Sequence, residues 1–536
     1  MIRTVATALA LAALGGCTLA PKYVRPEAPV PLSWPTGDAY LRSSEATLPS
    51  VSYRDIFRDV RLQSIIVQAL ANNRDLRVAA ANIAIARAQY RIQRAELFPE
   101  IGTTGSYSRR RTSSAGGNST TGIGGVGTGT GGAGTGDVGT GTGGTGNGGT
   151  GNGGTGGTGT GGSGAGTGAG TAFSTSVGGT TNSFTANVGI TAFELDLFGR
   201  VRSLSTAAQN RYFETEATAR ATRLTLIGDI ATGWLTYASD KSLLRIAEQT
   251  AQIAQKSVTL TTQRLNGGIA PRTDLAQAQI TLQTALSDLA EQRTALAQDA
   301  NALQLLVGAP VDPALLPDAI EQAGQTVAEL PAGLDSRVLL RRPDVVEAEY
   351  ELRAANAEIG AARAELFPTI SLTALTGFAS SALSNLFTGG AFTYSIAPSV
   401  NYSIFRAGAG RANVAQSRAQ RDSALASYER AIQTAFREVS DALARRGTIT
   451  EQERAQQALT AASRENFELS NARYQGGIDT YLQSLTAQQS FYSSQRSLVD
   501  TQLIAATNLV TLYRTLGGDA TLDRAPDDTR PTPATK

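Results

Sequence analysis

The sequence predicts a mainly α-helical protein with an internal two-fold repeat and four β-strands long enough to cross a membrane. Three patterns lead to this prediction. The hexapeptide Arg94–Pro99 returns as Arg363–Pro368, two segments of alternating polarity follow each copy, and long stretches free of proline follow those segments. Because a repeated order of elements indicates two halves of similar structure, we expect the same strands and helices in both.

The N-terminus has the pattern of a secretory signal that ends in a lipidation site. A basic residue, Arg3, precedes an apolar run that ends in the tetrapeptide Leu14–Cys17. This tetrapeptide resembles the lipobox of bacterial lipoprotein precursors, in which the cysteine is acylated and becomes the first mature residue. Cys17 is the only cysteine of the chain, which favours lipidation over the alternative of a plain signal peptide with a chance cysteine. By the same resemblance, Thr18 after the cysteine directs the protein to the outer membrane.

The repeat and the composition divide the chain into six predicted segments. More than half of the 57 glycines fall between Gly116 and Gly170, which we interpret as a disordered insertion at 111–182 in the first half only. In chain order the segments are a lipoprotein signal peptide (1–16), a lipidated, proline-rich, extended tether (17–50), the first repeat (51–308), a connection (309–334), the second repeat (335–517) and a flexible C-terminal tail (518–536).

Each repeat begins with a helix that proline stops, near Leu97 in the first half and near Leu366 in the second. Two period-2 segments follow each stop, and a strand crosses a bilayer in about 9 to 11 residues. The alternative for these segments is a pair of soluble hairpins. The predicted strands are Ile101–Arg109, Phe184–Phe193, Thr369–Phe378 and Phe392–Phe405.

Very long helices follow the strands. The stretches Arg200–Arg264 and Arg411–Arg473 contain no proline, and a helix of that length reaches roughly 100 Å at about 1.5 Å per residue. The returning segment of the first half carries leucines one heptad apart, which predicts a coiled-coil seam. These leucines are Leu275, Leu282, Leu289, Leu296 and Leu303, and the second half has Ser484, Phe491, Leu498, Ala505 and Leu512 at the corresponding places.

Four strands cannot close a membrane barrel, because single-chain outer-membrane barrels start at about eight strands and open sheet edges are not tolerated in hydrocarbon. Several chains must therefore contribute strands. Two copies would give a barrel filled by side chains, whereas three would give twelve strands and leave a lumen. A trimeric channel is the simplest closed solution.

The composition excludes several classes of function. The chain has no histidine, so the commonest catalytic base and zinc ligand is missing, and one cysteine cannot build a thiolate cluster. We therefore expect no enzymatic activity, no metal and no cofactor. With 47 basic and 45 acidic side chains, the net charge gives no reason to expect a nucleic-acid partner.

Four sequence motifs together resemble the outer-membrane factor family of tripartite efflux pumps, in particular the lipoprotein branch found with resistance-nodulation-division transporters. The match covers nearly the whole chain. The motifs are the lipobox followed by Ala20-Pro21-Lys22-Tyr23, the repeated Ala-Glu-Leu-Phe-Pro, Phe193–Arg200 and Arg473–Asp479. The resemblance implies a homotrimer with a twelve-stranded β-barrel in the bacterial outer membrane and a coiled-coil α-barrel in the periplasm. It also places segment 309–334 at the equator of that α-barrel and the glycine-rich loop outside the cell.

The resemblance further implies a function and partners. The trimer is expected to be a passive conduit that exports small molecules such as drugs and toxic compounds. A proton-driven inner-membrane transporter would load it, a periplasmic adaptor protein would bridge the two, and outer-membrane lipid would surround the barrel. One alternative is an exit duct for type I protein secretion, and another, of a different class, is a lipid-anchored coiled-coil surface protein with a structural or adhesive role.

Site residues follow from the two inter-helix tips, which in the family form the periplasmic gate and the adaptor-docking face. The expected docking residues are Gly267, Gly268 and Ile269 in the first tip and Gly476, Gly477 and Ile478 in the second. The expected gate residues are Leu482, Asp479, Tyr474, Asp274, Thr486 and Gln489.

One departure from the family pattern concerns this gate. Many members carry Asp-Ala-Gln-Arg after the second tip, where this chain has Thr486-Ala487-Gln488-Gln489, so neither charge is present. The sequence therefore predicts a closed state held by Leu482 packing and neutral hydrogen bonds, with Asp274 as the remaining charged member.

Overall fold

A computed structural model of the chain describes residues 18–31, 33–35, 53–111, 180–328 and 336–518. Cys17, most of the glycine-rich insertion and the C-terminal tail lie outside these residues. The chain divides into two compact units. One comprises Met1–Glu100, Ala192–Thr373 and Ala397–Lys536, and the other comprises Ile101–Thr191 and Ala374–Ile396.

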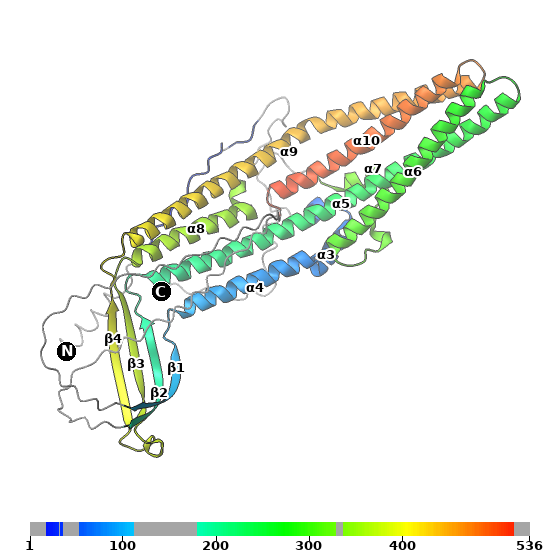
Figure 1. The fold of residues 1–536 in the computed structure, drawn as a ribbon. Coiled ribbons are helices and arrows are strands. Elements are labelled where there is room, and N and C mark those ends of the chain that lie inside the picture. The colour runs from blue at the N-terminus through cyan, green and yellow to red at the C-terminus, as the bar shows by residue number, and fades with distance from the viewer. Residues whose placement is uncertain (1–17, 32, 36–52, 112–179, 329–335, 519–536) are drawn as a thin grey trace, which may run out of the picture. The chain divides into compact units, whose positions relative to one another are not determined.

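The first unit is helical, and its helices follow the predicted repeat (Figure 1). In the first half, α4 leads through two strands to α5 and α6, and in the second half α8 leads through two strands to α9 and α10. No helix among the described residues is long and apolar enough to cross a membrane. The helices are α2 (Tyr53–Ile56), α3 (Val60–Asn72), α4 (Arg74–Ala95), α5 (Arg200–Asn266), α6 (Arg272–Val307), α7 (Ile320–Ala323), α8 (Pro343–Ala364), α9 (Ala409–Gln475) and α10 (Tyr481–Thr515).

The two longest helices begin and end in the same way. Both α5 and α9 have 67 residues. A glycine in the left-handed conformation precedes each of them, Gly199 with φ 77° and Gly408 with φ 86°, where a side chain with a Cβ would be strained. The predicted Phe-Pro stops are also present, although α4 and α8 end at Ala95 and Ala364, two residues before the expected points.

The second unit contains most of a four-stranded sheet with the order β1-β2-β3-β4 (Figure 1). β1 pairs with β2 in antiparallel register, from Ile101 opposite Ile190 to Arg111 opposite Thr180. β2 and β3 approach closely at Gly377, where an added Cβ would lie 2.1 Å from the carbonyl oxygen of Ala186. The strands are β1 (Ile101–Arg111), β2 (Thr180–Glu194), β3 (Thr369–Ser380) and β4 (Phe392–Asn401).

Several strand boundaries differ from the sequence prediction. β1 extends to Arg111 and β2 begins at Thr180. The first residue and the last three residues of the segment 111–182, which was expected to be a disordered loop, therefore belong to paired strands. Threonine and serine in Thr180–Ser183 tolerate extended backbone, and β1 offers them hydrogen-bond partners. β4 ends at Asn401, before Ile404 and Phe405, which were expected inside the strand.

The main hydrophobic core surrounds Trp234 of α5. Its ring is fully buried, and its indole nitrogen donates a hydrogen bond to the carbonyl oxygen of Leu315 at 3.1 Å. Phe57 and Tyr513 pack edge to face in the same core with ring centroids 5.5 Å apart. The predicted leucine seam of α6 is only partly buried in the single chain, because Leu282 and Leu303 are buried while Leu286, in a complementary position, is 43% exposed.

The N-terminal segment is extended, as expected, but it packs against the helical unit instead of forming a free tether. Residues 18–31, called the N-terminal strap below, run along α8. Arg363 donates a hydrogen bond to the carbonyl oxygen of Leu19 at 3.0 Å, Asn356 donates to that of Pro21 at 2.8 Å, and Arg25 binds Glu349 through two nitrogens at 2.9 and 2.6 Å. The proline pattern did not indicate these contacts, since their partners lie more than half the chain away.

Candidate functional site

The candidate site is formed by the two tips where the long helices reverse direction. The first tip joins α5 to α6 and the second joins α9 to α10 (Figure 1). In each tip a glycine takes the left-handed conformation, Gly268 with φ 71° and Gly477 with φ 77°. The next residue, Ile269 or Ile478, donates its backbone N–H to the carbonyl oxygen of Arg264 or Arg473 at 2.9 Å. Both tips therefore use the same glycine-dependent helix ending.

Two isoleucines at these tips are largely exposed in the part of the chain that the structure describes. Ile269 is 79% exposed and Ile478 is 68% exposed. Gly268 and Gly477 have open space where a Cβ would lie. The backbone conformation, not crowding, therefore requires glycine at these two positions.

Tyr474 joins the second tip to the first. Its side chain is 4% exposed and belongs to a small apolar cluster with Ala278 of α6 and with Tyr481 and Leu485 of α10. The rings of Tyr474 and Tyr481 have centroids 5.5 Å apart. The Tyr474 hydroxyl lies 3.3 Å from the hydroxyl of Thr261 on α5. Tyr474 therefore contacts both helical hairpins.

Arg264 is the residue at this site that the sequence prediction missed. Its guanidinium lies 4.4 Å from the centroid of the Tyr474 ring. One terminal nitrogen donates hydrogen bonds to the carbonyl oxygens of Tyr474 at 2.7 Å and Gln475 at 3.0 Å. These carbonyls close α9, where a helix presents unpaired acceptors and the negative end of its dipole. Arg264 thus fastens the end of α5 to the end of α9 and stacks on an aromatic ring.

Asp479 binds an arginine of its own tip. Arg473 donates to its two carboxylate oxygens at 2.6 and 3.0 Å, a bidentate pair. The hydrogen bonds from Arg473 hold the pKa of Asp479 below its usual value. In the single chain this carboxylate therefore braces the second tip and does not reach the first.

The remaining expected gate residues lie on two helix starts. Leu482, Thr486 and Gln489 follow one exposed face of α10, with Leu482 67% exposed. The Thr486 hydroxyl donates back to the carbonyl oxygen of Leu482 at 2.9 Å. Asp274 lies in the first turn of α6, where a carboxylate is favoured by the helix dipole. Asp274 lies near Tyr481, the residue before Leu482: burial and, to a smaller extent, the charge of Asp274 raise the pKa of Tyr481.

A pair of carboxyl groups lies between the long helices away from the tips. Asp240 of α5 and Asp299 of α6 are hydrogen-bonded to each other, and Asp500 of α10 adds negative charge nearby. Burial and the charge of Asp240 raise the pKa of Asp299 to about 7. The pair therefore keeps a shared proton at mildly acidic pH and releases it as pH rises through about 7.

This pair makes the stability of the helical unit depend on pH. Since the pKa of Asp299 is about 7 in the folded chain and about 4 when unfolded, the folded state binds a proton that the unfolded state has released, and stability falls as pH rises between these values. We expect Asp299→Asn to raise the melting temperature relative to the wild type at pH 8 and to change it little at pH 4. Half-exposed Asp229, which pairs with Arg514, offers an Asp→Asn control whose effect should not change between these pH values. An equal shift at both pH values would contradict the prediction.

Comparison with known proteins decides the family. The sequence profile described as outer membrane efflux protein matches residues 65–141, 153–309 and 334–518. The chain belongs to the outer membrane efflux protein family. This confirms the resemblance inferred from the lipobox, the repeated Ala-Glu-Leu-Phe-Pro and the glycine tips.

Curated members of the outer membrane efflux protein family match along most of this chain. The probable efflux pump outer membrane protein TtgC of Pseudomonas putida is 39% identical over 507 residues, which cover 94% of this chain and 93% of that protein. Outer membrane protein OprJ of Pseudomonas aeruginosa is 34% identical over 508 residues, with the same coverage of both chains.

Solved structures of outer-membrane channels share the fold. The structure of CusC has a TM-score of 0.74 and 32% identity, and the alignment covers 94% of this chain and all of that one. The open state of the MtrE channel of Neisseria gonorrhoeae has a TM-score of 0.71 and 31% identity, covering 94% and 98%. The predicted fold class is confirmed. The chain is an outer-membrane component of an efflux pump, and its family is one of transport conduits.

Proposed function

We propose that three copies of this chain form a passive duct that carries small toxic molecules out of the cell as the outer-membrane part of a tripartite pump. The observation that carries the proposal is the match to efflux proteins over 94% of the chain. Similar relatives from Pseudomonas putida are named a toluene efflux protein, a solvent efflux protein and an antibiotic efflux protein. These names favour small, largely apolar substrates over secreted proteins.

The sheet supports the assembly from several copies. It has four strands, and β1 and β4 each have one neighbour within the sheet. Unpaired strand edges are costly in hydrocarbon, so β4 of one copy would pair with β1 of the next until the ring closes. Three copies give twelve strands and a lumen.

The partners and the anchor belong to the same proposal. A proton-driven inner-membrane transporter would supply the energy, and a periplasmic adaptor would bind the tips. The exposed isoleucines Ile269 and Ile478, held by Gly267, Gly268, Gly476 and Gly477, offer that adaptor two apolar contacts per copy. Cys17 lies outside the described residues. Leu19, two residues later, is held by a hydrogen bond from Arg363 at the end of α8, so a lipid on Cys17 would be attached close to this end of the helical unit.

The gate would close where the tips of three copies meet. Leu482, Thr486 and Gln489 form an exposed face of α10, on which the Leu482 side chain is 67% exposed among the described residues. Tyr474 and Arg264 hold the two tips of one copy together, Asp479 braces the second tip, and Asp274 stands at the start of α6. A closed state would then combine apolar packing between copies with hydrogen bonds within each copy.

Planar-bilayer recording on the purified protein tests this function. We expect the purified wild-type protein to form heat-resistant trimers, and we expect these trimers to conduct only weakly without their partners. Leu482→Ser should conduct more strongly, because a small polar side chain cannot fill an apolar constriction. A strain that lacks the gene should become more susceptible to solvents and drugs. Absence of any conductance, with unchanged susceptibility, would refute the duct and favour a surface structural protein.

A further inference from the structure

The second unit carries nearly all of its charge at the end of one strand. In the residues of this unit, 101–191 and 374–396, the charged side chains are Arg109, Arg110 and Arg111 at the end of β1 and Asp137 in the glycine-rich insertion. All three arginines are exposed. Since one carboxylate can neutralise only one of them, at least two positive charges have no counter-charge within the unit. An exposed cluster of this kind attracts anions.

The two faces of the β1–β2 pair differ in polarity. Directly opposite residues of an antiparallel pair share a face, and successive residues of a strand alternate between the faces. One face is polar, and on it the hydroxyls of Ser106 and Thr185 lie 2.7 Å apart. The other face is mainly apolar. Its opposite pairs include Ile101 with Ile190, Thr103 with Val188, and Tyr107 with Phe184. Where strands cross a membrane around a water-filled duct, the apolar face meets lipid and the polar face meets the lumen.

The same alternation separates the three arginines. Arg109 and Arg111 follow Tyr107 at every second position of β1, so they continue the apolar face, whereas Arg110 continues the polar face. Arg109 and Arg111 are therefore the pair on the lipid side. Arg110 has the same charge at the same end of the strand but lies on the opposite face.

Aromatic rings lie next to these arginines on the apolar face. The rings of Tyr107 and Phe184 stack with centroids 4.7 Å apart. Phe378 of β3, beside the close approach of β2 and β3, contacts the rings of Phe387 and Phe392 at 5.5 and 6.1 Å. Aromatic residues gather where membrane strands pass from hydrocarbon to lipid headgroups. The lipid-side arginines lie about 7 and 13 Å beyond Tyr107 along the strand, which places them at the headgroups.

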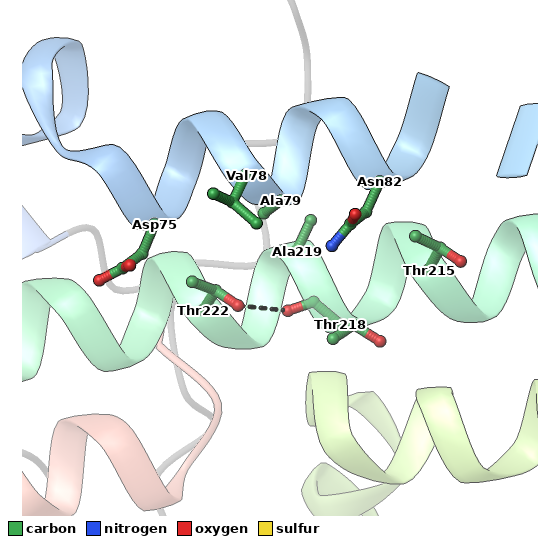
Figure 2. A pocket seen from close by; sticks show the side chains of 8 residues that line it. All are labelled: Asp75, Val78, Ala79, Asn82, Thr215, Thr218, Ala219 and Thr222. Carbon is green, nitrogen blue, oxygen red and sulfur yellow. Dashed lines mark hydrogen bonds between the residues drawn. The ribbon is translucent and has the colours of Figure 1, made fainter. Parts of the chain in front are cut away.

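A groove on the helical unit has the opposite electrostatic character. Figure 2 shows this groove of about 240 Å³ between α4 and α5, where Asp75 is the one charged side chain among the lining residues. Threonines and alanines make up most of the rest. Because a carboxylate repels phosphate, this groove does not compete with the arginines of β1 for an anionic ligand.

We infer that Arg109 and Arg111 bind the phosphate groups of an anionic lipid in the outer leaflet of the membrane. A guanidinium can donate two hydrogen bonds to one phosphate, which makes arginine well suited to this contact. α4 precedes β1 and α5 follows β2, so both helices join the opposite end of the strand pair. With these helices in the periplasm, the arginine end reaches the outer leaflet. The inference rests on the proposed outer-membrane duct and names a lipid that the duct holds.

Native mass spectrometry of the full-length protein in detergent tests this site, with lipid A, a glycolipid that carries two phosphates, as the probe. We expect Arg109→Gln with Arg111→Gln to weaken lipid A binding about 25-fold, since each basic residue near an anionic surface contributes about fivefold. Arg109→Lys with Arg111→Lys keeps both charges and should restore most of the binding. The matched control is Arg110→Gln, which removes the same charge from the other face and should bind as the wild type does.

Three results would overturn the lipid site. They are undiminished binding by the double glutamine variant, an equal loss of binding in Arg110→Gln, and displacement of lipid A by millimolar inorganic phosphate, which would indicate a site for free phosphate. If the double glutamine variant does not assemble, Arg109→Gln alone gives the same test with an expected loss of about fivefold.

Conductance recorded on the same preparations separates this inference from the proposed function. A protein that conducts in planar bilayers but binds lipid A equally well without Arg109 and Arg111 overturns the lipid site alone. A protein that binds lipid A through these arginines but never conducts overturns the duct and leaves the lipid site standing.

Discussion

Arg264→Met should shift the channel toward its open state. The substitution keeps an apolar side chain over Tyr474 but removes both hydrogen bonds to the carbonyl oxygens of Tyr474 and Gln475. Hydrogen bonds from a charged donor contribute about 1.5–3 kcal/mol. If the contact of Arg264 with the end of α9, called the Arg264 latch below, exists only in the closed state, the open fraction should rise roughly tenfold to a hundredfold. Single-channel recording at neutral pH measures this fraction directly.

A matched variant separates the effect of losing the Arg264 latch from the effect of losing one positive charge on α5. Lys256 lies on the same helix and is exposed, so Lys256→Met removes a positive charge and adds the same side chain away from the tips. We expect wild-type conductance for this variant. If both variants conduct alike, or if Arg264→Met folds and conducts as the wild type does, Arg264 does not hold the closed state.

Glu349→Ala should destabilise the helical unit and loosen the N-terminal strap from α8. The Glu349 side chain is 5% exposed and binds both Arg25 of the strap and Arg353 of its own helix at 2.6 Å. Losing the hydrogen bonds from these two charged donors costs about 1.5–3 kcal/mol; the remaining Arg25 and Arg353 side chains are 49% and 33% exposed, so water partly replaces their lost partner. Chemical unfolding followed by circular dichroism in detergent measures the change in free energy.

The same network predicts a pH dependence and a control. Burial alone would raise the pKa of Glu349, but the hydrogen bonds from Arg25 and Arg353 outweigh it and hold the pKa below its usual value. The stabilisation is therefore complete above the unfolded pKa of about 4.3 and is lost as pH falls below it. Asp229→Ala breaks a half-exposed pair with Arg514 and should cost less than about 1 kcal/mol. Equal costs for the two variants at pH 7 would contradict the assignment.

Local sequence signals predicted much of this fold because their causes are local. Proline after Phe98 and Phe367 ends a helix wherever the chain folds, and glycine before α5 and α9 permits a conformation that other residues avoid. The distance along the sequence from the second strand to the tip is similar in the two halves, and this similarity predicted the same order of elements in both. These features required no knowledge of which helices meet.

Contacts between distant segments could not be predicted in the same way. Arg264 precedes its tip as Arg473 precedes the other, so the two arginines look equivalent in sequence, yet one binds the neighbouring hairpin and the other binds Asp479 in its own tip. The proline-rich strap likewise gave no sign that Arg25 would reach Glu349. Such pairings depend on the three-dimensional arrangement of helices.

The equal length of α5 and α9 restricts which insertions and deletions the long helices can tolerate. One residue removed from either helix would draw its tip back by about 1.5 Å and rotate it by about 100°, which would turn Arg264 away from the last carbonyls of α9. A change of about seven residues restores the rotation but still leaves the tips at different heights. Viable insertions and deletions in the long helices should therefore occur in both halves together and in multiples of a heptad.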